Sequence, residues 1–102
     1  MADPNLGTAI REALNKPSEP IHASDLTGIS SLSASNRGIE DLSRLEYCTN
    51  LIELDLISNQ ISDISPLANL TKLTNLCLSS NQISDIRPLV RNEGLGTAMK
   101  LP

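Results

Sequence analysis

The chain has 102 residues, a net charge of −4 and a hydrophobic content of 39%. This length allows a single domain, and because one tyrosine is the only aromatic residue, the core must be built from leucine and isoleucine. The acidic balance argues against a nucleic-acid partner, and the lack of a long apolar run argues against insertion into a membrane.

The first predicted element is an amphipathic helix over residues 3–16. Asp3 can accept a hydrogen bond from a free amide of the first turn, and Pro4 suits the first helical position. Pro17 and Pro20 are expected to end the helix, because proline cannot donate the backbone hydrogen bond that a helix interior needs. Apolar side chains recur every four residues in one stripe, at Leu6, Ile10 and Leu14.

A short second helical piece is predicted over residues 23–28. The two helices form a segment, residues 1–28, that directly precedes a set of repeats. Such a segment is either an ordinary surface helix or a cap that covers one end of the repeats. Its position immediately before the first repeat favours the cap.

Three stretches of 22 residues follow, at positions 29–50, 51–72 and 73–94. The second and third begin LIELDLISNQISDISPL and LTNLCLSSNQISDIRPL, so nearly every apolar position recurs. In the first stretch, Arg37 stands where the others have asparagine, and Asn36 lies one place early. Self-similarity at this period, with the pattern L-x-x-L-x-L-x-x-N-x-I, predicts a stack of leucine-rich repeats.

Each repeat is predicted to wind once around the stack, and we call one such winding a coil. The alternation of Leu54 and Leu56 with polar residues predicts a short strand, and stacking pairs these strands in parallel. Asn59 and Asn81 follow where the backbone must turn. Their side chains are predicted to form an internal ladder that bonds turn peptide groups, whose loss would cost roughly 1–3 kcal/mol.

A short helical turn is predicted on the outer side of each coil. Ser65, followed by proline, is expected to cap this turn in the second coil, and Ser43 is expected to do so in the first. Arg87 stands at the same position in the third coil, where the sequence predicts that the cap is lost.

The repeat pattern breaks down at the end of the chain, which leaves residues 95–102 as a truncated closing segment. Met99, Lys100 and Leu101 are expected to add a fourth, shortened strand. This irregular end predicts either a piece of a longer protein or a chain that self-associates through its open C-terminal repeat.

Function is expected on the concave face of the sheet, where alternate strand residues point away from the core. This candidate binding face comprises Ser31, Ser33, Ser35, Glu53, Asp55, Ile57, Asn75, Cys77 and Ser79. It lacks tyrosine, tryptophan and arginine, which dominate the energy of many interfaces, but Ile57 and Cys77 are apolar where solvent is expected. The pattern fits a solvated sheet surface and a protein-binding surface about equally well.

The coil sequences NQISDISPL and NQISDIRPL, with the opening DPNLGTAIREALNKPSEPI, resemble the internalin group of bacterial leucine-rich repeat proteins. The resemblance implies an α/β fold: a right-handed solenoid with a short parallel β-sheet on the concave face, 3-10 or short helical turns on the convex face, and an N-terminal helical cap. It implies a non-catalytic module for protein–protein interaction or adhesion in a bacterial surface or secreted protein. The alternative is a structural cap and folding nucleus whose ligand-binding repeats lie outside this chain.

The resemblance also implies an unidentified protein ligand and an extracellular or cell-surface location. A basic start followed by an apolar stretch, the mark of a secretion signal, is not visible in the sequence. The sequence by itself therefore leaves a cytoplasmic location open.

The sequence predicts no catalytic residue and no enzyme. His22 is the only histidine. Ser24 and Asp25 lie near it in sequence, but a catalytic triad is defined by spatial geometry and not by neighbours along the chain. An ordinary surface residue at a helix start is the favoured interpretation of His22.

No metal or cofactor site is predicted either. The strand and turn carboxylates lack the spacing of a calcium-binding loop, and Asp63 and Asp85 are expected to bond turn amides instead. Cys48 and Cys77 lack the spacing of a zinc site. Because the repeat pattern directs them to different surfaces, both are expected to be reduced.

Overall fold

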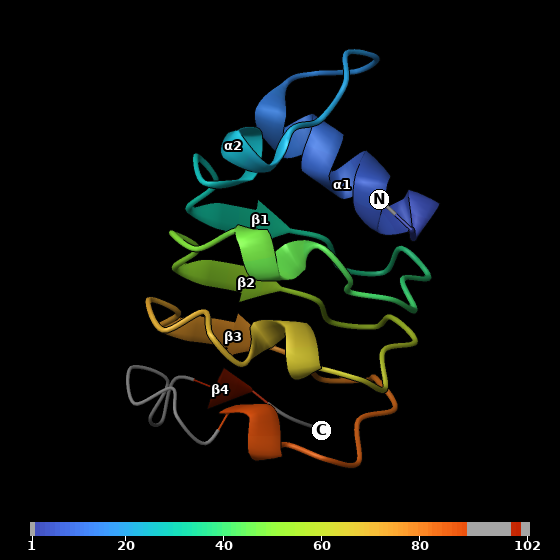
Figure 1. The fold of residues 1–102 in the computed structure, drawn as a ribbon. Coiled ribbons are helices and arrows are strands. Elements are labelled where there is room, and N and C mark those ends of the chain that lie inside the picture. The colour runs from blue at the N-terminus through green and yellow to red at the C-terminus, as the bar shows by residue number, and fades with distance from the viewer. Residues whose placement is uncertain (1, 90–98, 101–102) are drawn as a thin grey trace.

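The computed structural model describes residues 2–89 and 99–100, which form a stack of coils with a helix over one end (Figure 1). Two α-helices lead the chain, α1 (Pro4–Leu14) and α2 (Ala23–Leu26). Strands and short 3-10 helices then alternate: β1 (Ser31–Ser33), η1 (Leu45–Tyr47), β2 (Glu53–Asp55), η2 (Ser65–Leu67), β3 (Asn75–Cys77), η3 (Arg87–Leu89) and β4 (Met99–Lys100).

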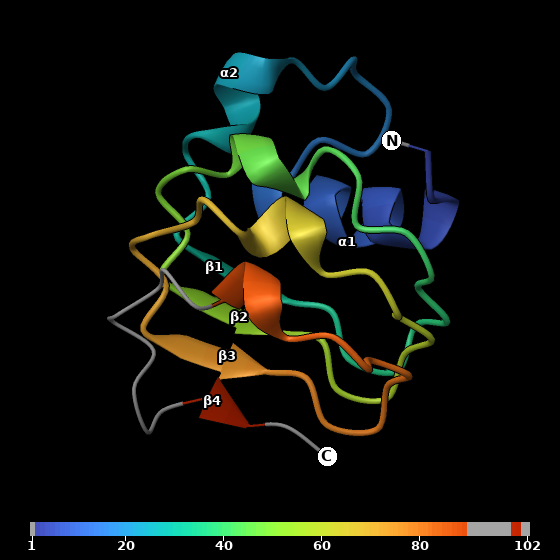
Figure 2. The ribbon, with the colours of Figure 1, turned by 60° about the horizontal axis from the view of Figure 1, so that its bottom comes forward.

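The strands form one parallel sheet in the order β1-β2-β3-β4. Leu32 pairs with Leu54, and Leu54 pairs with Leu76, so β2 and β3 each lie beside the strand one repeat earlier. The 3-10 helices lie across the coils from the sheet (Figure 2). This arrangement confirms the predicted fold class, a leucine-rich repeat solenoid with a helical N-terminal end.

Helix α1 begins where predicted and ends earlier than the prolines require. The Asp3 side chain accepts hydrogen bonds from the backbone N–H groups of Asn5 and Leu6, which caps the first turn. Asn15 adopts a left-handed conformation with φ of 56° and closes the last turn. The prediction that Pro17 and Pro20 end the helix is therefore wrong, because the chain has already turned at Asn15.

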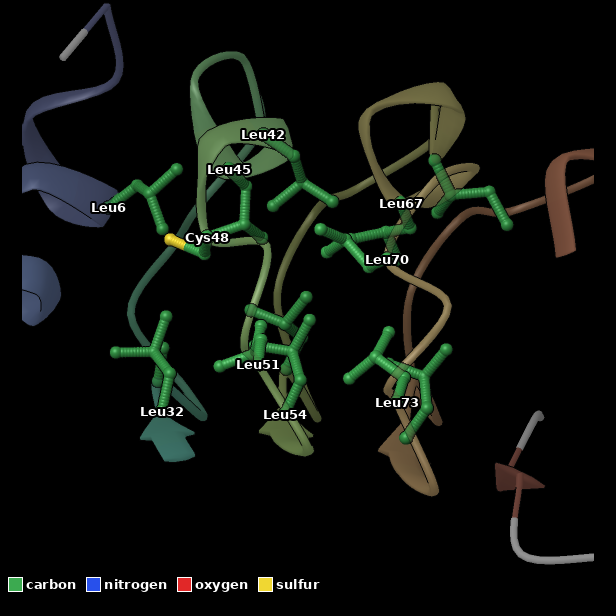
Figure 3. Packing of buried hydrophobic residues seen from close by; sticks show 14 of the residues in the cluster. Leu6, Leu32, Leu42, Leu45, Cys48, Leu51, Leu54, Leu67, Leu70 and Leu73 are labelled. Atoms are coloured by element: carbon green, nitrogen blue, oxygen red, sulfur yellow. The ribbon is translucent and has the colours of Figure 1, made fainter. Parts of the chain in front are cut away.

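The core is a layer of aliphatic side chains between the sheet and the outer turns (Figure 3). Leu6 and Ile10 of α1 cover the first coil and are fully buried. Helix α2 adds Leu26, and the coils supply the other large buried residues: Ile29, Leu32, Ile39, Leu42, Leu45, Leu51, Leu54, Leu56, Ile61, Ile64, Leu67, Leu70, Leu73, Leu76, Leu78 and Leu89. Tyr47 lies outside this layer and is 45% exposed. Since each coil packs its leucines against its neighbours, no coil buries its core alone.

The outer turns are held by aspartates and not by the serines. Asp63 Oδ1 accepts from the backbone N–H of Ser65 at 2.9 Å, and Asp85 Oδ1 accepts from Arg87 at 3.0 Å. Asp41 does the same in the first coil for Ser43. The predicted serine caps are wrong, whereas the predicted bonds from Asp63 and Asp85 to turn amides are confirmed. The third coil keeps its cap because the aspartate, not the serine, supplies the acceptor.

The first coil has a different outer turn from the others. Arg44 adopts a left-handed backbone with φ of 86°, at the repeat position that Pro66 and Pro88 occupy in the next two coils. The 3-10 helix η1 consequently begins at Leu45, two residues later in the repeat than η2 does. The Arg44 guanidinium lies over the Tyr47 ring, with Cζ 5.7 Å from the ring centroid.

A different backbone position, just after each strand, is left-handed in all three coils. Asn36, Ser58 and Ser80 have φ of 55°, 61° and 60° and lie one repeat apart, at the start of the turn that follows each strand. Asparagine tolerates this conformation better than most residues. Asn36 is therefore not a displaced member of the ladder but the first coil's residue at this backbone position.

The far end of the stack is less well covered than the end under α1. Ile86 is 47% exposed, although Ile64, at the same position of the second coil, is 1% exposed. Strand β4 pairs with β3, as predicted for Met99 and Lys100. Leu101 and most of the closing segment lie outside the described residues. The division into residues 1–28, 29–50, 51–72, 73–94 and 95–102 stays a prediction.

Candidate functional site

The nine residues of the candidate binding face lie on the side of the sheet away from the core. Ser31, Ser33 and Ser35 come from the first coil and are exposed. The other six follow from the second and third coils: exposed Glu53 and Asn75, and half-buried Asp55, Ile57, Cys77 and Ser79. The strand register lines up the six that lie on strands in two rows, one of which is Ser33, Asp55 and Cys77. The face is thus a set of side chains carried by the hydrogen-bonded sheet and the residues that follow its strands.

The middle of this face is a shallow hollow of about 390 Å³. Outward side chains of β1, β2 and β3 line it, with Glu53 and Asp55 at its centre. The Asn75 amide donates to Glu53 Oε2 at 3.4 Å, and the Ile57 backbone N–H donates to Asp55 Oδ1 at 3.1 Å. Small serines on the β1 side leave the two carboxylates accessible.

Asn59 lies inside the stack and joins two coils. Its Oδ1 accepts from the backbone N–H groups of Arg37 and Ile39, both at 3.0 Å. Its Nδ2 donates to the carbonyls of Ala34 and Leu56, both at 2.9 Å. With 6% of its surface exposed, the side chain satisfies peptide groups that no strand neighbour reaches.

Asn81 repeats this arrangement one coil later with fewer contacts. Its Oδ1 accepts from the Ile61 N–H at 3.1 Å, and its Nδ2 donates to the carbonyls of Leu56 and Leu78 at 2.8 and 2.9 Å. Asn81 is half-buried. In the first coil the ladder position holds Arg37, whose guanidinium reaches Glu12 of α1 at 2.7 Å.

Sequence reasoning missed the second role of Asp3. While Oδ1 caps α1, Oδ2 accepts from the backbone N–H groups of Glu40 and Asp41 at 2.8 and 3.0 Å. Burial of the carboxylate raises its pKa, but the four backbone N–H bonds outweigh burial and leave the pKa lowered. The carboxylate thereby bonds two further amides of the first coil, whose turn Asn59 also bonds.

The residues considered for catalysis do not form a triad. The carboxylate of Asp25 accepts from the backbone N–H of His22 at 2.8 Å and from the Lys16 ammonium at 3.1 Å. It is therefore engaged at the start of α2 and with Lys16. Within residues 2–89 and 99–100, no group of His, Cys, Asp and Glu side chains is arranged to hold a metal ion.

The two cysteines are free and differ in environment. Cys48 is fully buried against Leu6 and the first-coil leucines (Figure 3), and burial raises the pKa of its thiol to about 11. Cys77 lies half-buried on the concave face.

The helices that the structure describes are too short and too polar to span a membrane.

The sequence matches the family model of leucine-rich repeats, described as two copies, over residues 21–69 and again over residues 49–91. The chain belongs to the leucine-rich repeat family. Within that family it is of the internalin type, as the solved structures that resemble it show. No curated protein matches its sequence.

An internalin, InlF, from Listeria monocytogenes is 38% identical, with a TM-score of 0.91 over 99% of this chain. Internalin C2 of the same organism is also 38% identical, with a TM-score of 0.87 over 91% of this chain. The functional domain of Listeria InlJ, which includes a cysteine ladder, is 29% identical, with a TM-score of 0.77 over 88% of this chain. The chain spans 29%, 42% and 20% of the lengths of these three structures.

Proposed function

We propose that this chain is a protein-interaction module of the internalin type and that its concave face is the contact surface. The observation that carries the proposal is the register of the sheet, which holds six of the nine outward side chains, two on each of β1, β2 and β3, in fixed rows. Leucine-rich repeat proteins generally bind protein ligands on such extended surfaces. The hollow over β2 gives the face a shape that a partner side chain can enter.

The proposed module is non-catalytic and acts in a bacterial surface or secreted protein, as the internalin resemblance implies. An adhesive role fits a module of this size if other coils contribute area. A standard interface buries about 800 Å² on each partner. A face of three short strands offers only part of that area. We therefore expect weak binding by this chain alone.

Binding to an array of extracellular protein domains tests the proposal. Ser33 is the middle one of the three exposed serines that the first coil contributes to this face. Ser33→Arg should abolish specific capture, because it places a long charged side chain in the face. Ser62 is exposed and lies outside the strands, so Ser62→Arg is the matched control and should bind like the unchanged chain. Equal capture by the two variants, or no captured protein, would contradict a concave-face interaction.

The exposed side chain of Ile86 favours a second proposal, self-association through the third coil. Burial of an isoleucine between two copies would remove apolar surface from water. Sedimentation equilibrium should then show dimers that Ile86→Ser disrupts. The control Ile52→Ser, which replaces another exposed isoleucine, should leave the dimers intact.

A monomer that binds no protein would instead support the alternative role, a structural cap and folding nucleus for binding repeats elsewhere.

A further inference from the structure

We infer that the concave face takes an arginine or lysine side chain from an extended segment of its protein partner, at the two carboxylates of β2. This inference rests on the proposed protein-binding function and names the chemistry of the ligand. It follows from the charges, contacts and shape of the hollow over β2.

The negative charge of the candidate binding face lies on β2. Glu53 and Asp55 are two residues apart on β2, so they point to the same side of the sheet about 7 Å apart. At the paired positions on either side lie Ser31 and Ser33 of β1 and Asn75 and Cys77 of β3, none of which carries a positive charge. The register places Lys100 one strand beyond Cys77, so the carboxylates face the hollow without a cation beside them in the β1–β3 rows.

The carboxylates also retain acceptor capacity. Asp55 uses Oδ1 for the Ile57 N–H, and Glu53 uses Oε2 for the Asn75 amide at the long distance of 3.4 Å. Among the described residues, neither carboxylate makes an ion pair, although three other carboxylates do. A guanidinium or ammonium group can therefore bond Asp55 Oδ2 and Glu53 Oε1 without breaking a contact that the fold needs.

The shape of the hollow admits a long, slender side chain. Its volume of about 390 Å³ is bounded on one side by the small Ser31 and Ser33. Arginine presents a planar fork of donors that matches a carboxylate, and such charge-assisted pairs are about twice as strong as neutral hydrogen bonds. Charge complementarity therefore selects a basic segment over an acidic or purely apolar one.

The test is an amide-resonance titration with a short peptide of alternating arginine and serine. Its matched probe replaces arginine by citrulline, which keeps the shape and removes the charge. The arginine peptide should shift the amides of residues 31–33, 53–55 and 75–77. The citrulline peptide should bind at least about tenfold more weakly, the equivalent of one lost charge-assisted bond.

Two double variants separate a site from general charge attraction. Glu53→Gln with Asp55→Asn keeps the shapes and the Oδ1 acceptor, and should weaken the arginine peptide by at least about tenfold. Glu19→Gln with Glu40→Gln removes the same charge from exposed positions off the face, and should bind like the unchanged chain. Equal loss in both, or resonance shifts at the acidic outer hollow beside Glu40 and Asp63, would overturn the inference.

Failure of this inference is distinguishable from failure of the proposed function. If Ser33→Arg abolishes capture from the protein array while the arginine peptide does not bind, the face binds protein through uncharged contacts, and the cation preference is wrong. If neither the array nor the peptide gives binding, both are wrong.

Discussion

Asp3 accepts a hydrogen bond from the backbone N–H of Glu40, a residue 37 positions later, at 2.8 Å. The same carboxylate caps α1. One side chain thus fixes the start of the helix and the turn of the first coil together. The Arg37–Glu12 ion pair is a second link between α1 and this coil, but it is exposed and contributes little to stability.

Replacing Asp3 by asparagine should lower the free energy of unfolding by about 2 kcal/mol, within the range of hydrogen bonds to charged groups. Asparagine would place an amide N–H donor where Oδ2 now lies, and this donor cannot accept hydrogen bonds from the two backbone N–H groups there. Urea unfolding followed by circular dichroism would measure the loss. Glu40→Gln, at an exposed carboxylate, is the control and should leave the midpoint unchanged. A loss as small as the control would mean that Asp3 only caps the helix.

The contribution of Asp3 should depend on pH. Because the native-state pKa of Asp3 is lowered by its backbone N–H bonds, its stabilisation is fully present above the ordinary value of 3.8 and is lost as pH falls through the native-state pKa. The difference in unfolding free energy between the unchanged chain and Asp3→Asn should be constant near neutral pH and shrink below about pH 4. A difference that grows in acid would contradict the assignment.

Alanine at the ladder positions should reveal their order of importance. Asn59→Ala should cost roughly 1–3 kcal/mol, because it leaves buried peptide groups of two coils unpaired. Asn81→Ala should cost less, since Asn81 is only half-buried. Within the described residues its Oδ1 accepts a hydrogen bond from one backbone N–H group, that of Ile61. Asn75→Ala, on the concave face, is the matched control and should change stability by under about 0.5 kcal/mol. Equal effects in chemical denaturation would show that the register is misassigned.

Proline at position 44 should destabilise the protein, although both other coils carry proline there. Proline fixes φ near −65°, which is incompatible with the left-handed Arg44, so Arg44→Pro should lose about 3 kcal/mol. Arg44→Gly should stay within about 1 kcal/mol, because relief of the left-handed strain offsets the lost contact with Tyr47. Thermal unfolding would compare the two. A proline variant as stable as the glycine variant would show that this turn can adopt the geometry of η2.

The two thiols should label at different rates. Cys77 should react with a maleimide in the native protein, whereas Cys48 should react only on unfolding, since it is fully buried and its thiol pKa is raised to about 11. Mass spectrometry of digested peptides would locate the label. Label on Cys48 with Cys77 protected would mean that the two faces have been assigned backwards.

The periodicity of the sequence was enough to predict the coils, the sheet order and the inward direction of the coil leucines that the structure describes. A strict repeat sets which residues become neighbours, so Asn59 could be assigned to the interior without coordinates. The alternation along β2 likewise predicted that Glu53 and Asp55 face outward. Whether that face binds a protein does not follow from its direction and stays a prediction.

Three features could not be predicted from the sequence, each for a physical reason. The second role of Asp3 depends on a residue far along the chain, which no local motif encodes. The bond from Asp63 to a turn amide was predicted, but aspartate and serine are both good capping residues, so residue type could not show that Asp63 holds the turn without a cap from Ser65. The positive φ of Arg44 arises in a coil that lacks the proline of its neighbours, and arginine carries no preference for that conformation.

Helix α1 covers one end of the stack, whereas Ile86 is exposed at the other. The two ends therefore differ in how readily they could accept another coil. A duplicated coil inserted after the third would find a surface of the same kind as the one it presents, because Ile86 stands where Ile64 is buried. A coil inserted ahead of the first would have to displace a helix that Asp3 fastens to the turn at Glu40. We therefore expect an added coil to be tolerated better after the third coil than ahead of the first.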